Sequence, residues 1–299
     1  MERKNYLIML GAPKCGTTSL SVWLGEQPYA VLAKKKETLY FTDFADHSWH
    51  GPSADFAAGR PSSIQEFDAQ FDDKPEAELR IEASTDNLSC LATPERIARF
   101  RDRDDVGEVW AVIVLRDPIE RIVSEYEHTL RMGWQSGSLL QSLQAEKDRA
   151  AKGYHPLFRH VERSSYATQI ARFKEQFGER LLVLDFHQIR EASERRRLLS
   201  WMGYADKSEI KELQHKNERS VVARPGTVGV LKNETLKKAG RAIVPKSLRP
   251  LVRQWITGGQ VGRYKANETE MAFMRDALAD EIKACVEAPD IPTENWTVR

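Results

Sequence analysis

One short segment near the amino terminus combines residue types that bind phosphate. Residues 11–19 read GAPKCGTTS, with Gly11 and Gly16 on either side of a lysine and three hydroxyl residues after them. The glycines allow a tight turn and a close approach of the backbone to a ligand. If the hydroxyl residues begin a helix, its first N–H groups and its positive dipole end point toward that ligand. The segment therefore predicts an anion site, with phosphate as the usual ligand and Lys14 as an added positive charge.

The flanking residues must hold this segment in place. Residues 5–10 are few and mostly apolar, which is typical of a buried parallel strand. Residues 17–27 carry Leu20, Trp23 and Leu24 at the spacing of one helix face. The sequence therefore predicts a strand, a turn and a helix, with Trp23 in the core and the anion site at the start of the helix.

The Walker A loop of ATP and GTP enzymes offers a first comparison. That loop has four residues between two glycines, then a lysine, then Ser or Thr. Gly11 and Gly16 have this separation, but Thr17 follows the second glycine and the lysine stands two places before it. A nucleoside triphosphatase needs its lysine on the β- and γ-phosphates and its hydroxyl on magnesium. The displaced lysine indicates that this loop holds a different group.

A second anion site is predicted about 100 residues later. Residues 108–115, EVWAVIVL, read as a buried strand, and RDPIERIVSEY follows directly. Pro118 stands early in the next segment, where a helix tolerates proline. Arg116 closes the strand and Ser124 lies about two turns into the helix, so both can meet one anion at the carboxyl edge of a parallel sheet. Two anion sites on one sheet suit a nucleotide with two separated phosphate groups.

The two segments resemble the signatures of sulfotransferases that use 3′-phosphoadenosine 5′-phosphosulfate (PAPS). In that family, a loop like PKCGTTSL holds the 5′-phosphosulfate, and the arginine and serine of a segment like RDPIERIVSEY hold the 3′-phosphate. The resemblance covers residues 6–203. It implies a three-layer α/β/α fold with a central, mostly parallel sheet like that of P-loop NTPases. The donor-binding residues that it implies are Lys14, Cys15, Gly16, Thr17, Thr18, Ser19, Arg116 and Ser124, with Arg219 and Arg224 as candidates over the adenine and 3′-phosphate.

The resemblance also implies catalytic residues. In the heparan-type branch of the family a segment of the form K-E-x-x-aromatic-F follows the first helix, and residues 36–41, KETLYF, match it. Glu37 is then the general base that takes the proton of the acceptor. Lys14 stabilises the leaving phosphate, and no metal is implied. Glu82 or a histidine such as His47 or His50 is left as an alternative base.

One position departs from the family pattern. Many relatives carry a lysine directly before the serine in a K-S/T-P-x-Y segment, whereas this chain has Ala83 before Ser84. A second cation near the acceptor is therefore missing. The resemblance consequently says less about the acceptor than about the donor.

Composition limits the remaining possibilities. The 299 residues have a net charge of +1, so no overall field favours nucleic acid. Three cysteines without a motif spacing indicate reduced thiols and a cytoplasmic protein. Because the charged residues 1–5 run directly into the first predicted strand, we expect no signal peptide, and without a run of 18 apolar residues we expect no membrane span. We expect one domain over residues 1–299, with a core at 5–203 and a helical part at 204–299 that covers the site.

The functional hypothesis is transfer of a sulfuryl group from PAPS, with adenosine 3′,5′-bisphosphate (PAP) as the product. The acceptor is a hydroxyl or an amine of a carbohydrate, a lipid or a small metabolite. Two alternatives stay open: a P-loop kinase for a small metabolite, and a nucleotide-binding protein without catalysis. Neither the identity of the acceptor nor the oligomeric state follows from the sequence.

Overall fold

The centre of the molecule is a sheet of five parallel strands. The computed structural model describes residues 3–52, 55, 58–208, 210, 212–213 and 264–298. The strands lie in the order β2-β3-β1-β4-β5, and each pairs with its neighbour in parallel. Their bounds are β1 (Lys4–Gly11), β2 (Ala30–Leu32), β3 (Leu79–Ala83), β4 (Val106–Leu115) and β5 (Leu181–Asp185). The apolar runs at residues 5–10 and 108–115 are thus confirmed as strands, as are the further runs that the sequence predicts at 30–33, 79–84 and 180–186.

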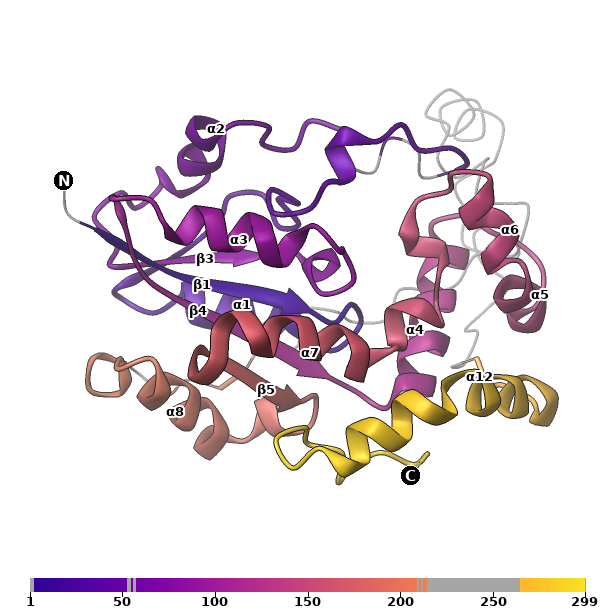
Figure 1. Cartoon of the computed structure of the whole chain (residues 1–299). Coiled ribbons are helices and arrows are strands. Elements are labelled where there is room, and N and C mark those ends of the chain that lie inside the picture. Colours follow the sequence, from indigo (N-terminus) through magenta and orange to yellow (C-terminus); the bar gives the residue numbers. More distant parts are fainter. Residues whose placement is uncertain are drawn as a thin grey trace, which may run out of the picture.

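Helices cover both faces of this sheet (Figure 1). α1 (Thr17–Gly25) and α8 (Ala192–Trp201) share one face, where the Arg195 guanidinium lies 5.4 Å from the Trp23 ring. α3 (Thr93–Arg101) and α7 (Tyr166–Phe177) cover the other face. The three-layer α/β/α class predicted from the sequence is confirmed.

The carboxyl ends of the strands point toward α4 (Pro118–Arg131), which lies across that edge of the sheet (Figure 1). α12 (Glu268–Glu287) packs against α4, and α2 (Ile64–Asp68) lies near the opposite end of the sheet. Such an edge is where open α/β sheets bind ligands, because the loops that follow the strands meet there. The architecture therefore brings both predicted anion segments to one side of the molecule.

Burial follows the apolar pattern of the sequence. The second half of β4, from Ala111 to Leu115, is completely buried, as expected for a central parallel strand. Trp23 is 2% exposed, which confirms its predicted place in the core. Trp296 near the carboxyl terminus is 4% exposed and faces the Tyr166 ring at 5.9 Å, so the final residues return to the core.

Several predicted helices have different bounds in the structure. The charged residues 138–152 also predict one helix, but the structure has two short helices, α5 (Leu139–Gln144) and α6 (Glu146–Ala151), and the Ala145 N–H between them donates to the Gln141 carbonyl at 3.1 Å. The sequence also predicts a helix at 187–204, whereas in the structure α8 begins only at Ala192, after a 3-10 turn at Gln188–Arg190. The sequence predicts Thr93, directly before Pro94, as the cap of a helix, but Ala92 occupies the cap position of α3 and Thr93 is its first helical residue.

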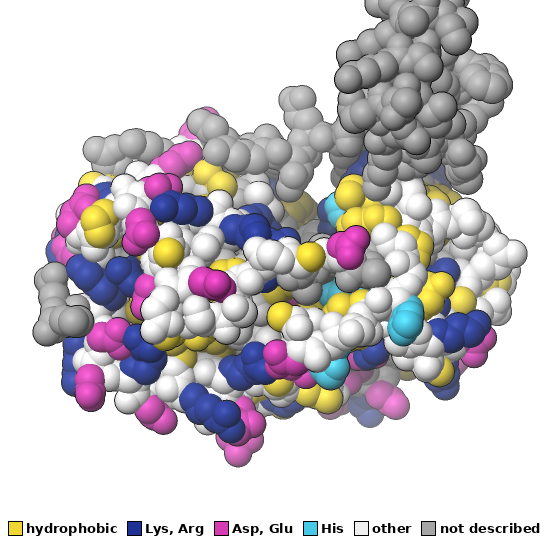
Figure 2. Space-filling view, turned by 90° about the horizontal axis from the view of Figure 1, so that it is seen from above, with side chains coloured by type: hydrophobic (Ala, Val, Ile, Leu, Met, Phe, Trp, Pro, Cys, Tyr) yellow, Lys and Arg dark blue, Asp and Glu magenta, His cyan; other side chains and the backbone are white. Residues whose placement is uncertain are grey.

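The surface carries both signs of charge. Figure 2 shows basic and acidic side chains interspersed over the described part of one face. This distribution agrees with the near-zero net charge, and it offers no continuous positive track on that part of the face for a long polyanion. Among the described residues, no helix combines the length and apolar character that crossing a membrane requires.

Candidate active site

The turn between β1 and α1 has the backbone geometry of an anion-binding loop. Lys14 and Gly16 have φ values of 68° and 85°, both in the left-handed region. A Cβ atom at Gly16 would lie 2.9 Å from Ile189 Cδ1, closer than real contacts allow, and 3.0 Å from Phe186 Cδ2, which is also a tight contact. Glycine is therefore required at this position by both the backbone angle and the neighbouring side chains.

The donors of this loop are free for a ligand. Among the described residues, the backbone N–H groups of residues 14–19 have no acceptor, and the next N–H, that of Leu20, already bonds to the Gly16 carbonyl at 3.2 Å. The hydroxyls of Thr17, Thr18 and Ser19 likewise make no side-chain hydrogen bond within that part of the chain. Consecutive N–H groups at the start of a helix form a cradle for an oxyanion, because the helix dipole adds to their charge.

Lys14 lies in a positively charged neighbourhood. Burial lowers the pKa of its ammonium group, and the charges of Arg131 and Lys36 lower it further, while Glu125 acts in the opposite direction. No carboxylate pairs with Lys14 among the described residues. An anion bound in the loop would relieve this repulsion, so the charge arrangement favours a negatively charged ligand.

The thiol of Cys15 points away from the open side of the loop. Its sulfur is fully buried and lies 3.8 Å from the Tyr166 hydroxyl. Burial raises the pKa of the Cys15 thiol to about 11, so the thiol is protonated near neutral pH. Cys15 can therefore offer a ligand its backbone N–H group, while its side chain belongs to the core.

Glu37 is held at the surface of the same region by several donors. Its carboxylate accepts the Thr85 N–H at 2.7 Å and the Thr85 hydroxyl at 3.2 Å, and it pairs with the Lys36 ammonium. The side chain remains 19% exposed. Its backbone has a φ of 60°, an unusual angle for a residue with a side chain. Lys36 also acts on Lys14, so Glu37 and Lys14 belong to one charged neighbourhood.

The alternative bases are less suitable in this structure. Glu82 has no exposed surface, and its oxygens accept from Thr38 at 2.7 Å, Asn87 at 2.8 Å and the Ser84 hydroxyl. Burial raises the pKa of Glu82 above its ordinary value. A carboxyl enclosed in this way cannot reach an acceptor without rearrangement.

The histidines of the long loop lie on the surface. His47 and His50 are both exposed, and the His47 ring lies 3.2 Å from the Asp43 carboxylate. His50 is held through its backbone, whose N–H donates to the Gly153 carbonyl at 2.9 Å. Because both rings are exposed, neither lies in an enclosed site with Lys14. The assignment of the base among Glu37, Glu82 and a histidine stays a prediction.

Arg116 connects the second anion segment to the first. Its guanidinium is 11% exposed, pairs with Glu120 and stacks on the Phe186 ring at 5.1 Å. The same ring packs against Gly16, and the charge of Arg116 acts on the Cys15 thiol. The end of β4 and the anion loop are therefore neighbours.

Arg116 also borders a cavity of about 260 Å³, together with one side of α4 and residues 264–271. Lys14 is not among the residues that line this cavity. The contact between the two predicted anion sites therefore runs through Phe186, which does not line this cavity.

Ser124 and the start of α4 complete this part of the site. The Ser124 side chain makes no hydrogen bond within the described residues and is half-buried. Asp117 caps α4 by accepting the N–H groups of the second and third helical residues, and its other oxygen accepts the N–H and hydroxyl of Thr297 at 2.8 and 2.7 Å. The carboxyl-terminal residues thus fix the helix that carries Ser124. Arg219 and Arg224 lie outside the described residues.

A buried network of charges lies beneath these loops. Glu125 pairs with Arg121 at 2.9 Å and with Arg163 at 3.1 Å, and Arg163 also pairs with Asp86. Burial alone would raise the pKa of Glu125, but the two guanidiniums outweigh it and hold that pKa well below its usual range. Asp86 directly follows Thr85, so the network is adjacent to the residue that holds Glu37.

Glu146, at the start of α6, is a buried carboxyl whose titration can be measured. Burial raises its pKa from 4.5 to about 8, although the Val161 N–H donates to it at 3.1 Å. Because the folded state binds this proton more tightly than the unfolded chain, the ionisation destabilises the fold as pH rises from 4.5 to 8.

We expect Glu146→Gln to remove this contribution. Thermal melting should show the variant and the wild type equally stable near pH 4.5, with the variant the more stable one above pH 8. The neighbouring exposed change Asp148→Asn serves as the control for loss of one charge. A constant difference between Glu146→Gln and the wild type over this range would contradict the assignment.

The structure adds two residues that the sequence did not single out. His128 lies one turn after Ser124 on α4, and burial together with the charges of Lys14 and Arg131 lowers its pKa to about 4, so its ring is neutral near neutral pH. The spacing of four residues from Ser124 was the available signal, because it places both on one helix face. Phe186 offered no such signal, since its role depends on contacts across the fold.

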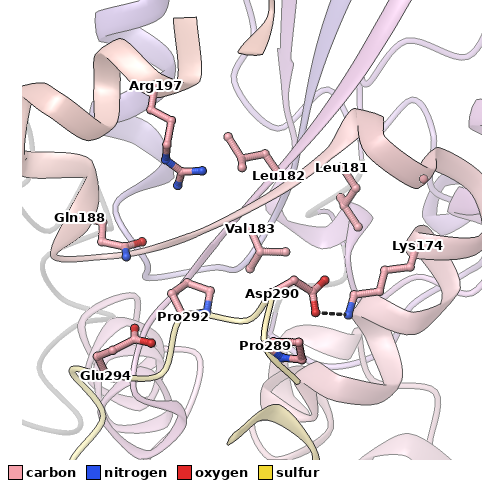
Figure 3. A pocket seen from close by; sticks show the side chains of 11 residues that line it. Lys174, Leu181, Leu182, Val183, Gln188, Arg197, Pro289, Asp290, Pro292 and Glu294 are labelled. Carbon is pink, nitrogen blue, oxygen red and sulfur yellow. Dashed lines mark hydrogen bonds and ion pairs between the residues drawn. The ribbon is translucent and has the colours of Figure 1, made fainter. Parts of the chain in front are cut away.

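A different cavity lies away from this edge. It has a volume of about 390 Å³ and lies beside β5, between α7, α8 and residues 289–294 (Figure 3). The Lys174 ammonium and the Asp290 carboxylate form an ion pair across it at 2.7 Å. None of the predicted site residues lines it. Within the part of the chain that the structure describes, no group of three or more His, Cys, Asp or Glu side chains is arranged to hold a metal ion.

Comparison with solved structures identifies the fold. The crystal structure of a sulfotransferase from Alicyclobacillus acidocaldarius matches over 87% of this chain and 98% of its own, with a TM-score of 0.63 and 23% identity. The sulfotransferase domain of the Synechococcus PCC 7002 olefin synthase matches over 93% and 96%, with 11% identity and a TM-score of 0.38, which is too low to support a conclusion. No family profile and no curated protein sequence matches this chain. The chain has a sulfotransferase-type fold.

Proposed function

We propose that this protein is a sulfotransferase that moves a sulfuryl group from PAPS to a hydroxyl or an amine of a carbohydrate, lipid or small-metabolite acceptor. The observation that carries the proposal is the pairing of two anion sites at one sheet edge. One is the loop at residues 14–19 with its unpaired N–H groups, and the other is Arg116, joined to that loop through Phe186. The sulfotransferase-type fold supports the same conclusion.

The proposed reaction is a single displacement at sulfur. The acceptor oxygen or nitrogen forms a bond to sulfur as its proton passes to the Glu37 carboxylate, and the bond from sulfur to the bridging phosphate oxygen breaks. The leaving group is the 5′-phosphate of PAP. Lys14 and the N–H groups of the loop stabilise the charge that develops on it. Arg116 and Ser124 hold the 3′-phosphate, and this remote binding aligns the reacting atoms.

The charge around Lys14 fits this role. Burial lowers the pKa of its ammonium group, and the charges of Arg131 and Lys36 lower it further, so a negative charge in the loop would be favourable. The charge of the bound donor would raise this pKa, because an anion favours the charged form of a nearby amine. All three cysteines are free and buried, which agrees with the proposal that the protein works in the cytoplasm.

Calorimetry and transfer of radiolabel test the proposal together. We expect PAP to bind with micromolar affinity or better in the absence of magnesium, and radiolabelled sulfate to move from PAPS to an acceptor within a panel of hydroxyl and amine compounds. Binding of ATP only with magnesium would indicate the kinase instead. Tight binding of PAP with no transfer to any acceptor would favour the non-catalytic alternative.

The pair of Arg116 and Glu120 allows a test of the 3′-phosphate site. The Glu120 carboxylate forms an ion pair with the Arg116 guanidinium. A phosphate that binds Arg116 must therefore compete with this carboxylate. Arg116→Ala should weaken PAP binding by about tenfold or more, since a hydrogen-bonded charge is lost. Glu120→Gln should strengthen PAP binding severalfold. Calorimetric titration measures both, and an unchanged affinity in the alanine variant would remove Arg116 from the donor site.

A further inference from the structure

The loop after β5 packs beside both predicted anion sites. Residues 186–190 lie between β5 and α8 and include the 3-10 turn at Gln188–Arg190, and two of their apolar side chains, Phe186 and Ile189, pack against Gly16. The Phe186 N–H also donates to the carbonyl of Leu115, the last residue of β4, at 2.7 Å. The loop is therefore fixed both to the start of α1 and to the end of β4. The residues predicted to bind PAPS lie at these two places.

Two guanidinium groups share the ring of Phe186. The Cζ atom of Arg190 lies 4.5 Å from the ring centroid, and that of Arg116 lies 5.1 Å from it. An aromatic face attracts a planar guanidinium and orients it, while the N–H donors at the guanidinium edge stay available for other partners. One ring thus holds both cations in the same neighbourhood at the edge of the sheet.

Arg190 differs from Arg116 in having no acidic partner among the described residues. Arg116 already has the Glu120 carboxylate, whereas no carboxylate pairs with Arg190 among the described residues. The backbone of Arg190 is nevertheless fixed, because its N–H donates to the His187 carbonyl at 3.1 Å and its carbonyl accepts from Arg195 at 2.6 Å. An exposed guanidinium on a fixed backbone can bind an external anion with little loss of backbone freedom.

We propose that Arg190 is a second guanidinium of the 3′-phosphate site and that it binds the same phosphate as Arg116. A phosphate has enough oxygens to accept from two guanidiniums, and arginine donors match its geometry. Arg190 would then contribute to the selection of a nucleotide with a 3′-phosphate over a 5′-monophosphate. This inference rests on the proposed function, because that function supplies the bisphosphate ligand.

Calorimetry with two nucleotides tests this role. Arg190→Gln should weaken the binding of PAP by about tenfold to hundredfold, since hydrogen bonds to a charged group are lost. Its affinity for adenosine 5′-monophosphate should change by less than about twofold, because that ligand lacks the phosphate in question. The matched control is Arg196→Gln, which removes the same charge from an exposed arginine of α8 and should leave both affinities unchanged.

The outcomes separate this inference from the proposed function. If the wild type binds PAP and Arg190→Gln binds it equally well, the role of Arg190 is refuted while the sulfotransferase proposal stands. Equal weakening of both nucleotides would assign Arg190 to the adenosine or the 5′-phosphate and would also refute it. If Arg196→Gln weakens PAP binding as much as Arg190→Gln does, the effect comes from the change in net charge and the role of Arg190 is refuted. Failure of the wild type to bind PAP would overturn the proposed function and this inference with it.

Discussion

Replacing Lys14 with alanine is expected to lower sulfuryl transfer by about 100-fold or more, because a preorganised donor to the leaving group contributes roughly 3 to 4 kcal/mol to catalysis. The structure makes this substitution informative. Lys14 has a φ of 68°, and alanine carries a Cβ atom just as lysine does, so the backbone strain is the same in both proteins. The loop N–H groups remain, and the effect therefore reports on the ammonium group.

The measurement is the initial rate of transfer from radiolabelled PAPS, together with PAP affinity by calorimetry. Lys34→Ala is the control, because Lys34 is an exposed lysine that pairs with Asp73 at 3.3 Å and has no place in the proposed site. We expect the control to retain the wild-type rate. A Lys14→Ala enzyme with near-normal turnover would remove this residue from the mechanism.

Glu37→Gln should reduce turnover by about 100-fold or more and leave PAP affinity unchanged, because the general base contributes to the transfer of a proton and not to donor binding. Glutamine keeps the size of the side chain and can still accept from the Thr85 N–H, which donates to Glu37 at 2.7 Å. The loop should therefore keep its shape. The pH dependence of the residual rate reports whether another group takes the proton.

Glu82→Gln provides the comparison for this prediction. Glu82 is completely buried and hydrogen-bonded, so its change to glutamine should alter the melting temperature more than the rate. If Glu37→Gln retains most of the activity, Glu37 is not the base. The neutral ring of His128, close to Lys14, then becomes the first group to replace.

The sequence predicted the central sheet because strands depend on local patterns, while the two anion segments stay predictions. Short apolar runs gave the strands, and the glycines of the first loop marked the turn at Gly16, whose φ of 85° requires such a residue. Helix bounds were predicted less well. Neither the break at Ala145 nor the start of α8 at Ala192 has a side-chain cap that could mark it in the sequence, and apolar spacing alone does not fix the ends of a helix.

Contacts between distant segments could not be predicted from the sequence. Phe186 meets Gly16 and Arg116 only because β5 lies next to β4 in the sheet. Two other contacts likewise join residues far apart in the chain. Asp86 forms an ion pair with Arg163, and the Thr297 N–H donates to the Asp117 carboxylate. Such contacts follow from topology and packing, and a single sequence does not report either one directly.

The most direct measurement is a crystal structure of the complex with adenosine 3′,5′-bisphosphate. The account predicts one nucleotide with its 5′-phosphate on the N–H groups of residues 14–19 and beside Lys14, and with its 3′-phosphate on the Arg116 guanidinium after the Glu120 carboxylate has moved away. A nucleotide confined to the cavity between α4 and residues 264–271, with the loop at 14–19 empty, would contradict it.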